Sequence, residues 1–304
     1  MNMSQISWEI VEQIAQGKLG RVMAACPMCS AQRRTAKKRT SKVLAVALVE
    51  PEFAVYYCNH CGTNGYVHPD TRSKPVDHTE LQHRREQADR YAAQEKRKRT
   101  QQALKLWDGA QPSRGSLAET YLYQIRGIGD WLDTFAFLDQ VFRFHPDCPF
   151  GNERLPCLLA LVRDIKTDHP VAIHRTALTK DGHKIDRMSL GPVSGGAIKI
   201  SPDFEVHSGL MIGEGIETVL SASKLYQFKP IWSLIDAGNL AKFPTLSGIE
   251  CVTLAIDNDA AGMQAAEQCA RRLVQSGIEV ITTQTRRVND FNDMIMGSRH
   301  AATR

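Results

Sequence analysis

Apolar residues in the last third of the chain form four short runs, separated by segments with helical spacing. The runs, each typical of a buried strand, cover residues 210–213, 231–235, 251–256 and 280–285. The helical patterns between them cover residues 217–226, 240–243 and 260–275. Strands that alternate with helices in this way form a parallel sheet covered on both faces. The pattern therefore predicts an α/β domain over residues 208–304.

Acidic residues follow two of these predicted strands. Glu214 comes directly after the first run, and Asp257 and Asp259 come after the third. The carboxyl ends of parallel strands meet at one edge of a sheet, where ligands bind. Carboxylates gathered there repel one another unless a cation lies among them, and hard oxygen ligands suit Mg²⁺. We therefore expect metal-assisted chemistry on phosphodiesters. Glu217, in the helix that follows Glu214, either binds metal through water or caps that helix.

A second apolar pattern, near the N-terminus, predicts a hairpin between two Cys-x-x-Cys pairs. Residues 43–49 and 53–57 are strand-like, and 28 residues separate the pairs. The four cysteines are Cys26, Cys29, Cys58 and Cys61. Thiolates on two tight turns can bind one tetrahedral Zn²⁺. The spacing predicts a structural zinc ribbon over residues 1–70, and four buried free thiols are the alternative.

Basic residues cluster between the two cysteine pairs. They are Arg33, Arg34, Lys37, Lys38, Arg39 and Lys42. With Tyr56 and Tyr57 nearby, this segment is suited to hold a phosphate backbone and to stack bases. The alternative is a solvated loop.

A polar segment and a strand-rich segment connect the two ends of the chain. Residues 79–105 contain good helix formers and no Gly or Pro, which predicts an exposed basic helix within a linker over residues 71–107. That helix either follows phosphates or is a solvated spacer. Residues 108–207 begin with a short helical pattern at 117–127. Strand-like runs then cover residues 142–145, 157–162, 171–176 and 197–200.

Charge is distributed unevenly along the chain. Residues 1–105 carry 18 Lys and Arg against 10 Asp and Glu, whereas the remainder carries 20 against 23. A basic front and an acidic back suit a nucleic-acid-binding part ahead of a metal-binding sheet, although such asymmetry is also common in soluble proteins. No apolar run reaches 18 residues and the N-terminus lacks a signal-peptide core. We therefore expect a cytoplasmic protein without a membrane partner.

In its acidic motifs the chain resembles the topoisomerase–primase, or Toprim, family. That family carries a glutamate after its first strand and an Asp-x-Asp after a later one, matched here by Glu214 and by Asp257 and Asp259. A further acidic cluster with Asp290 and Asp293 is similar to the family's last acidic motif. The resemblance implies that these five carboxylates hold catalytic Mg²⁺ or Mn²⁺.

The order of the predicted parts resembles primases of bacteria, phages and plasmids. Those proteins place a basic subdomain, of mixed α+β structure, between the zinc ribbon and the Toprim domain. Its motifs are matched here by Tyr121, Leu122, Arg126, Gly127, Arg143, Phe144, His145, Arg175 and Lys184. The resemblance implies that Arg126 contacts nucleic acid. It also implies that Arg175 and Lys184 face the acidic site, contact phosphates and act in catalysis.

These resemblances imply a DNA-dependent primase that makes short RNA primers on single-stranded DNA from ribonucleoside triphosphates. The four-cysteine ribbon and the absence of a helicase-binding tail favour a phage, plasmid or integrated-element protein that uses a separate helicase. Two other functions are compatible with the motifs. One is a Toprim nuclease, and the other is a non-catalytic nucleic-acid-binding protein that assists replication.

Overall fold

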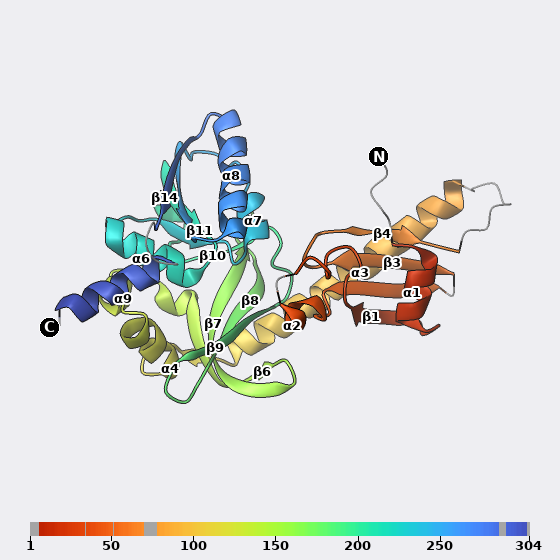
Figure 1. Cartoon of the computed structure of the whole chain (residues 1–304), viewed down its shortest axis with the longest axis horizontal. Coiled ribbons are helices and arrows are strands. Elements are labelled where there is room, and N and C mark those ends of the chain that lie inside the picture. The colour runs from red at the N-terminus through yellow and green to blue at the C-terminus, as the bar shows by residue number, and fades with distance from the viewer. Residues whose placement is uncertain (1–5, 34, 51, 70–77, 286–289, 303–304) are drawn as a thin grey trace. The chain divides into compact units, whose positions relative to one another are not determined.

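The chain forms two compact units, Met1–Gln94 and Glu95–Arg304. The computed structural model describes residues 6–33, 35–50, 52–69, 78–285 and 290–302 (Figure 1). No helix within these ranges is both long and apolar enough to cross a membrane.

The first unit is a four-stranded antiparallel sheet with a helix packed against it. Its elements are α1 (Trp8–Ala15), β1 (Gly20–Ala24), α2 (Ala36–Arg39), β2 (Leu44–Glu50), β3 (Phe53–Cys58) and β4 (Asn64–Val67). The strands lie in the order β1-β2-β3-β4. The predicted hairpin is therefore confirmed as β2 and β3, and α1, β1 and β4 are additions. The core contains Val11 of α1, Leu44 and Val46 of β2, and three of the four paired cysteines.

A long helix, α3 (His78–Asp108), connects the two units and confirms the predicted helix. The prediction that it is exposed throughout is wrong at its C-terminal end. Ala103 and Trp107 are buried there against the sheet of the second unit. Arg143 of that sheet stacks over the Trp107 ring at 4.7 Å and donates a hydrogen bond to the Trp107 carbonyl.

The second unit is built on one ten-stranded sheet. Its strands are β5 (Gln111–Pro112), β6 (Phe142–Phe150), β7 (Glu153–Asp164), β8 (Pro170–Leu178), β9 (Lys184–Leu190), β10 (Gly196–Lys199), β11 (Gly209–Gly213), β12 (Ile231–Ser233), β13 (Cys251–Ile256) and β14 (Glu279–Gln284). The order is β14-β13-β11-β12-β10-β7-β6-β5, and β8 pairs with β7 and β9. The first four strands are parallel, as predicted, and the rest pair antiparallel.

Helices cover both faces of the parallel strands (Figure 1). They are α6 (Ile216–Tyr226), α7 (Ala237–Ala241), α8 (Ala260–Gln275) and α9 (Phe291–Ala302). Helices α6 and α9 share one apolar cluster with Met211 and Ala255, while α7 and α8 share another with Leu210 and Ile212. Adjacent residues of each strand therefore point to opposite cores, as the buried runs predicted.

Short helical segments precede and interrupt the antiparallel strands. They are α4 (Leu117–Glu119), the π-helix η1 (Thr120–Ile125), α5 (Gly129–Leu132), and the 3₁₀ segments η2 (Leu138–Gln140) and η3 (Asp203–Glu205). The helix predicted at 117–127 is thus present as α4 followed by η1. Gly127 ends it with a φ of 67°, a conformation that glycine adopts readily.

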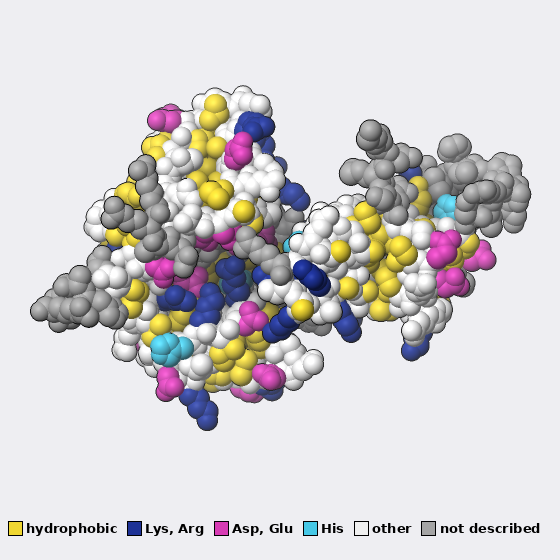
Figure 2. Space-filling model, viewed as in Figure 1, with side chains coloured by type: hydrophobic (Ala, Val, Ile, Leu, Met, Phe, Trp, Pro, Cys, Tyr) yellow, Lys and Arg dark blue, Asp and Glu magenta, His cyan; other side chains and the backbone are white. Residues whose placement is uncertain are grey.

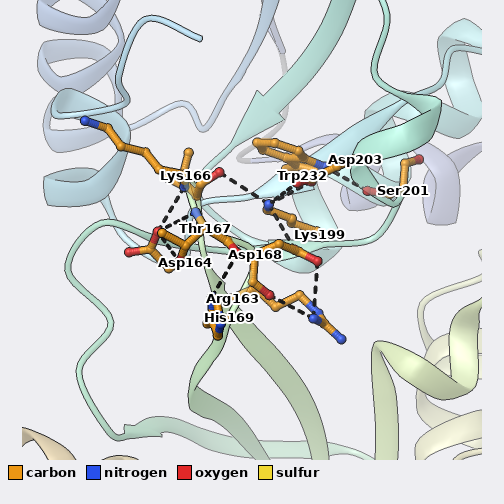
Figure 3. A network of polar contacts seen from close by, with 11 residues as sticks. Arg163, Asp164, Lys166, Thr167, Asp168, His169, Lys199, Ser201, Asp203 and Trp232 are labelled. Carbon is orange, nitrogen blue, oxygen red and sulfur yellow. Dashed lines mark hydrogen bonds and ion pairs between the residues drawn. The ribbon is translucent and has the colours of Figure 1, made fainter. Parts of the chain in front are cut away.

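Strand β10 joins the parallel and antiparallel parts of the sheet. Its Lys199 is almost fully buried, and its Nζ contacts Asp168 of the β7–β8 turn at 3.0 Å and Asp203 of η3 at 2.7 Å (Figure 3). The same ammonium lies 4.7 Å from the centre of the Trp232 ring on β12. One buried cation therefore ties together the strands on both sides of this joint.

Candidate active site

The strand order places two of the predicted acidic residues side by side. Strand β11 lies between β12 and β13, so the chain leaves β11 at the point where the sheet order changes direction. Glu214 follows β11 and Asp257 follows β13. Gly213 permits this approach, because a Cβ there would come within 2.7 Å of Val219 and 2.8 Å of the Ala255 carbonyl.

Glu214 and Asp257 lie in an environment that disfavours their negative charge. Burial raises the pKa of Glu214, and repulsion from Asp257 and Asp259 adds to it. Burial also raises the pKa of Asp257, together with repulsion from Asp290, although a 2.6 Å hydrogen bond from the Thr218 hydroxyl opposes the shift. A divalent cation at this edge would relieve that repulsion, so the donor set fits Mg²⁺ or Mn²⁺.

The other predicted acidic residues have additional structural roles. Asp259 is the N-cap of α8 and accepts a 2.7 Å hydrogen bond from the Gly262 N–H. Asp290 accepts a 2.9 Å hydrogen bond from the N–H of Asp293, which lies exposed in the first turn of α9. Within the described ranges, only the four paired cysteines bring three or more ligand atoms within 4.8 Å of one another. The five carboxylates are therefore not collected around one ion.

Basic side chains from β9 contact this acidic edge. The Lys184 ammonium lies 2.8 Å from Oε1 of Glu217, and the Arg187 guanidinium lies 3.3 Å from Oε1 of Glu214. Figure 2 shows Lys and Arg side chains grouped beside Asp and Glu side chains in this part of the second unit. The expectation that Lys184 faces the acidic site agrees with this placement. Arg187 was not predicted.

Glu217 is neither a helix cap nor an exposed group. The Tyr121 hydroxyl donates to the same oxygen that Lys184 contacts. Burial alone would raise the pKa of Glu217, but Lys184 and the Tyr121 hydroxyl hold it well below its usual range. Glu217 is therefore an ionised carboxylate that links α6 to β9 and η1.

The expectation that Arg175 faces the acidic site is wrong. Arg175 is buried beside Phe150 and donates hydrogen bonds to the carbonyls of Pro149 and Ser189. Successive residues of a strand point to opposite faces. The neighbouring His174 therefore lies on the Arg187 side, where its side chain contacts the Ser189 hydroxyl at 3.1 Å. The β8–β9 register contains an irregularity between Ala177 and Leu178, so residue spacing alone does not identify Arg187.

Arg126 is half-buried in the second unit. Its guanidinium donates a 3.1 Å hydrogen bond to Asn292 of α9 and stacks over the Tyr121 ring at 5.1 Å. These contacts give Arg126 a structural role, and its contact with nucleic acid stays a prediction.

The four paired cysteines of the first unit converge as predicted. Sγ of Cys26 lies 3.9 Å from Sγ of Cys61, and Sγ of Cys29 lies 3.8 Å from Sγ of Cys58. Zinc–sulfur bonds of about 2.3 Å in a tetrahedron give sulfur–sulfur distances of about 3.8 Å. Burial raises the pKa of the Cys29 and Cys58 thiols and so disfavours the thiolate form that binds metal. A bound cation would offset this cost. The cluster fits a tetrahedral metal ion.

The predicted basic segment is exposed at most of its described residues. Lys37, Lys38 and Arg39 form the exposed helix α2, which the Thr35 hydroxyl caps. Lys42 is also exposed and Arg33 is half-buried, whereas Arg34 lies outside the described residues. Tyr56 is buried in the core and is not available to stack a base; Tyr57 is 43% exposed.

Comparison with protein families identifies two regions of the chain. Residues 97–200 match a domain of unknown function, DUF7146, and residues 209–299 match the Toprim domain. No curated protein matches the chain.

Solved structures with similar folds include three primases. The primase fragment of the bacteriophage T7 primase-helicase protein is 14% identical, with a TM-score of 0.43, over 83% of this chain and 92% of that one. The Aquifex aeolicus primase, with its zinc-binding and RNA polymerase domains, is 13% identical, with a TM-score of 0.46, over 96% and 81%. A DNA primase domain from Pseudomonas aeruginosa is 11% identical, with a TM-score of 0.35, over 52% and 54%.

The Toprim match covers the parallel strands that carry Glu214 and Asp257. It also extends to α9, so it includes the last acidic motif. The fold therefore combines the predicted α/β domain with a four-cysteine ribbon that precedes it in the sequence. Residues 209–299 therefore match the Toprim domain.

Proposed function

We propose that the chain is a DNA-dependent primase that makes short RNA primers on single-stranded DNA by metal-assisted nucleotidyl transfer. The observation that carries this proposal is the contact of Lys184 and Arg187 with the acidic edge of the Toprim domain. Cations beside metal-binding carboxylates are what a site needs to hold a nucleoside triphosphate together with its metal.

Each group has a defined task in this proposal. Glu214, Asp257 and Asp259 would hold Mg²⁺ or Mn²⁺, and Asp290 and Asp293 would move closer to complete the set when the ion binds. The metal supplies charge neutralisation for the triphosphate and the leaving pyrophosphate. Arg187 exchanges its contact with Glu214 for a phosphate oxygen, which its planar guanidinium can grip through two hydrogen bonds. Lys184 keeps Glu217 ionised and adds positive charge beside the phosphates.

The first unit binds the template in this scheme. Its four cysteines hold a structural Zn²⁺, and the basic side chains of α2, with Arg33, Arg34 and Lys42, contact the DNA backbone. A separate replicative helicase is the expected partner. A phage, plasmid or integrated element is the proposed source, with action in the cytoplasm.

The test is primer synthesis by the full chain. Purified protein is incubated with single-stranded DNA, labelled ribonucleotides and Mg²⁺ or Mn²⁺, beside Asp257→Asn and Asp259→Asn variants. Asparagine caps helices as well as aspartate does, so Asp259→Asn removes the charge while keeping the start of α8. The matched control is Glu267→Gln, which removes an exposed carboxylate from the same helix.

We expect short labelled oligomers from the wild type and from Glu267→Gln, and none from the two aspartate variants. Shortened template without new product would identify a nuclease. Intact, bound DNA without product, in the presence of either metal, would identify an accessory protein and contradict the proposal.

A further inference from the structure

We infer that Arg126 is a positioning residue that acts through Asn292 to set the last acidic motif at the metal edge. The inference rests on the proposed function, because it concerns the same carboxylates. The residues that carry it come from three elements: the end of η1, helix α6, and the start of α9.

Asn292 binds Arg126 twice. Its Oδ1 accepts a 3.1 Å hydrogen bond from the Arg126 guanidinium, and its Nδ2 donates a 2.7 Å hydrogen bond to the Arg126 carbonyl. Nδ2 also lies 3.2 Å from the Ser221 hydroxyl of α6. Asn292 is only 1% exposed, so an unsatisfied amide there would be costly. These contacts hold the first turn of α9 in one position.

The π-helical turn places the Arg126 guanidinium against Tyr121, which in turn contacts Glu217. The Arg126 N–H donates to the carbonyl of Tyr121, five residues earlier, and the guanidinium stacks over the Tyr121 ring. A π-turn aligns residues five apart, and such turns are frequent at functional sites. The Tyr121 hydroxyl in turn donates to Glu217. Arg126 therefore connects Glu217 on α6 with Asn292 on α9.

Asn292 lies between the two acidic residues of the last motif, Asp290 and Asp293. Phe291 and Asn292 are buried, and Phe291 packs edge-on against Tyr226 at 6.3 Å. Asp290, directly before them, lies close enough to Asp257 to disfavour its ionised form. The buried pair thus anchors the motif directly beside Asp290, whose Oδ1 accepts a hydrogen bond from the Asp293 N–H. Loss of the Arg126 contact would free Asp290 from this position.

Metal affinity is the readout that separates this role from a contact with DNA. The zinc-loaded full chain is titrated with Mn²⁺, without nucleotide or DNA, and free Mn²⁺ is measured by electron paramagnetic resonance. Partners that orient metal ligands typically contribute 10- to 100-fold in affinity. We expect the Mn²⁺ dissociation constant to rise about tenfold in both Arg126→Ala and Asn292→Ala, and the double variant to show no further rise.

Lys224→Ala is the matched control. The Lys224 ammonium contacts the Gly127 carbonyl at 2.9 Å and also Asp130, so it joins α6 to the same segment without touching α9. We expect its Mn²⁺ affinity to equal that of the wild type. If Arg126→Ala does not fold, Arg126→Lys, which keeps the charge but loses the planar fork, should still weaken Mn²⁺ binding.

Three results would overturn the inference. The first is wild-type Mn²⁺ affinity in a folded Arg126 variant, with or without weaker DNA binding. The second is an equal loss of affinity in Lys224→Ala, which would indicate general loosening. The third is a wild-type chain that binds no Mn²⁺. A wild type that binds Mn²⁺ but makes no primer would contradict the proposed function and leave the positioning role standing.

Discussion

Glu217 shows at the scale of one residue how its neighbours determine its chemistry. From sequence it was either a metal ligand through water or a helix cap. In the fold, one of its oxygens is contacted by both Lys184, at 2.8 Å, and the Tyr121 hydroxyl. These residues lie 33 and 96 positions away along the chain, so no local pattern links them.

Glu217 should stabilise the fold in a pH-dependent way. Its folded-state pKa lies below the usual 4.5, so the ionised side chain contributes stability above pH 4.5. That contribution is lost as the pH falls from 4.5 towards the lower folded-state pKa. Glu217→Gln should therefore destabilise the second unit at about pH 7 and do so progressively less towards about pH 3. Urea unfolding at both pH values measures the difference.

The exposed Glu267→Gln substitution is the control for this prediction, with wild-type stability expected at both pH values. An equal loss for Glu217→Gln at neutral and acidic pH would contradict the predicted ionisation.

At the scale of elements, the ribbon of the first unit depends on its cysteines. Cys26, Cys29 and Cys58 are part of the small core that α1, β2 and β3 share. A unit of this size buries little apolar surface, and structural zinc commonly supplies the missing free energy of folding. The apolar runs at residues 43–49 and 53–57 predicted β2 and β3, and the hairpin between them agrees with a ligand site shared by the two cysteine pairs.

Removing the metal should unfold the first unit while leaving the second intact. We expect a strong chelator, or Cys58→Ser, to abolish the amide signals of β1 to β4 in a nuclear magnetic resonance spectrum of the full chain. Signals of the Toprim domain should persist. Cys251→Ser is the control, because Cys251 lies on β13 of the second unit. Amide signals of β2 and β3 that persist after complete loss of zinc would contradict the prediction.

At the scale of the second unit, one sheet runs through both the DUF7146 and the Toprim regions. Strand β10 pairs with β7 on one side and β12 on the other. The predicted boundary between the basic subdomain and the Toprim domain therefore separates strands of one continuous sheet. Asn239 of α7 links the two regions a second time. Its side chain donates a hydrogen bond to the Val193 carbonyl and accepts one from the Gly195 N–H. The loop between β9 and β10 is therefore held by α7.

Removing the buried Lys199 ammonium and removing its two counterions should have unequal effects on the stability of this joint. Lys199 has a 1% exposed side chain, whereas Asp168 and Asp203 are each 47% exposed. Replacing both aspartates with asparagine leaves a buried charge without its counterions and should cost about 3–5 kcal/mol. Lys199→Met leaves two partly hydrated carboxylates and should cost less. Calorimetric unfolding of the second unit measures both, and a larger loss for Lys199→Met would contradict the prediction.

The sequence by itself determined the features that depend on local spacing. The sequence predicted the parallel strands from continuous apolar runs and α6 and α8 from a period of 3.6 residues. It predicted the metal ligands from cysteines a few positions apart and from acidic residues that directly follow a strand. Glu214 and Asp257 could be placed together because parallel strands share an edge.

The tertiary structure decided what depends on register and on contacts between distant segments. Arg187 pairs with Thr176 and so lies on the face opposite to Arg175. The shift in the β8–β9 register between Ala177 and Leu178 lets Lys184, three residues from Arg187, reach the same acidic edge. Arg126 is held within the fold because a π-turn aligns it with Tyr121 and because Asn292, 166 residues later, supplies its partner. Side-chain direction across a sheet follows from hydrogen-bond pairing between strands, and that pairing is a property of the folded chain alone.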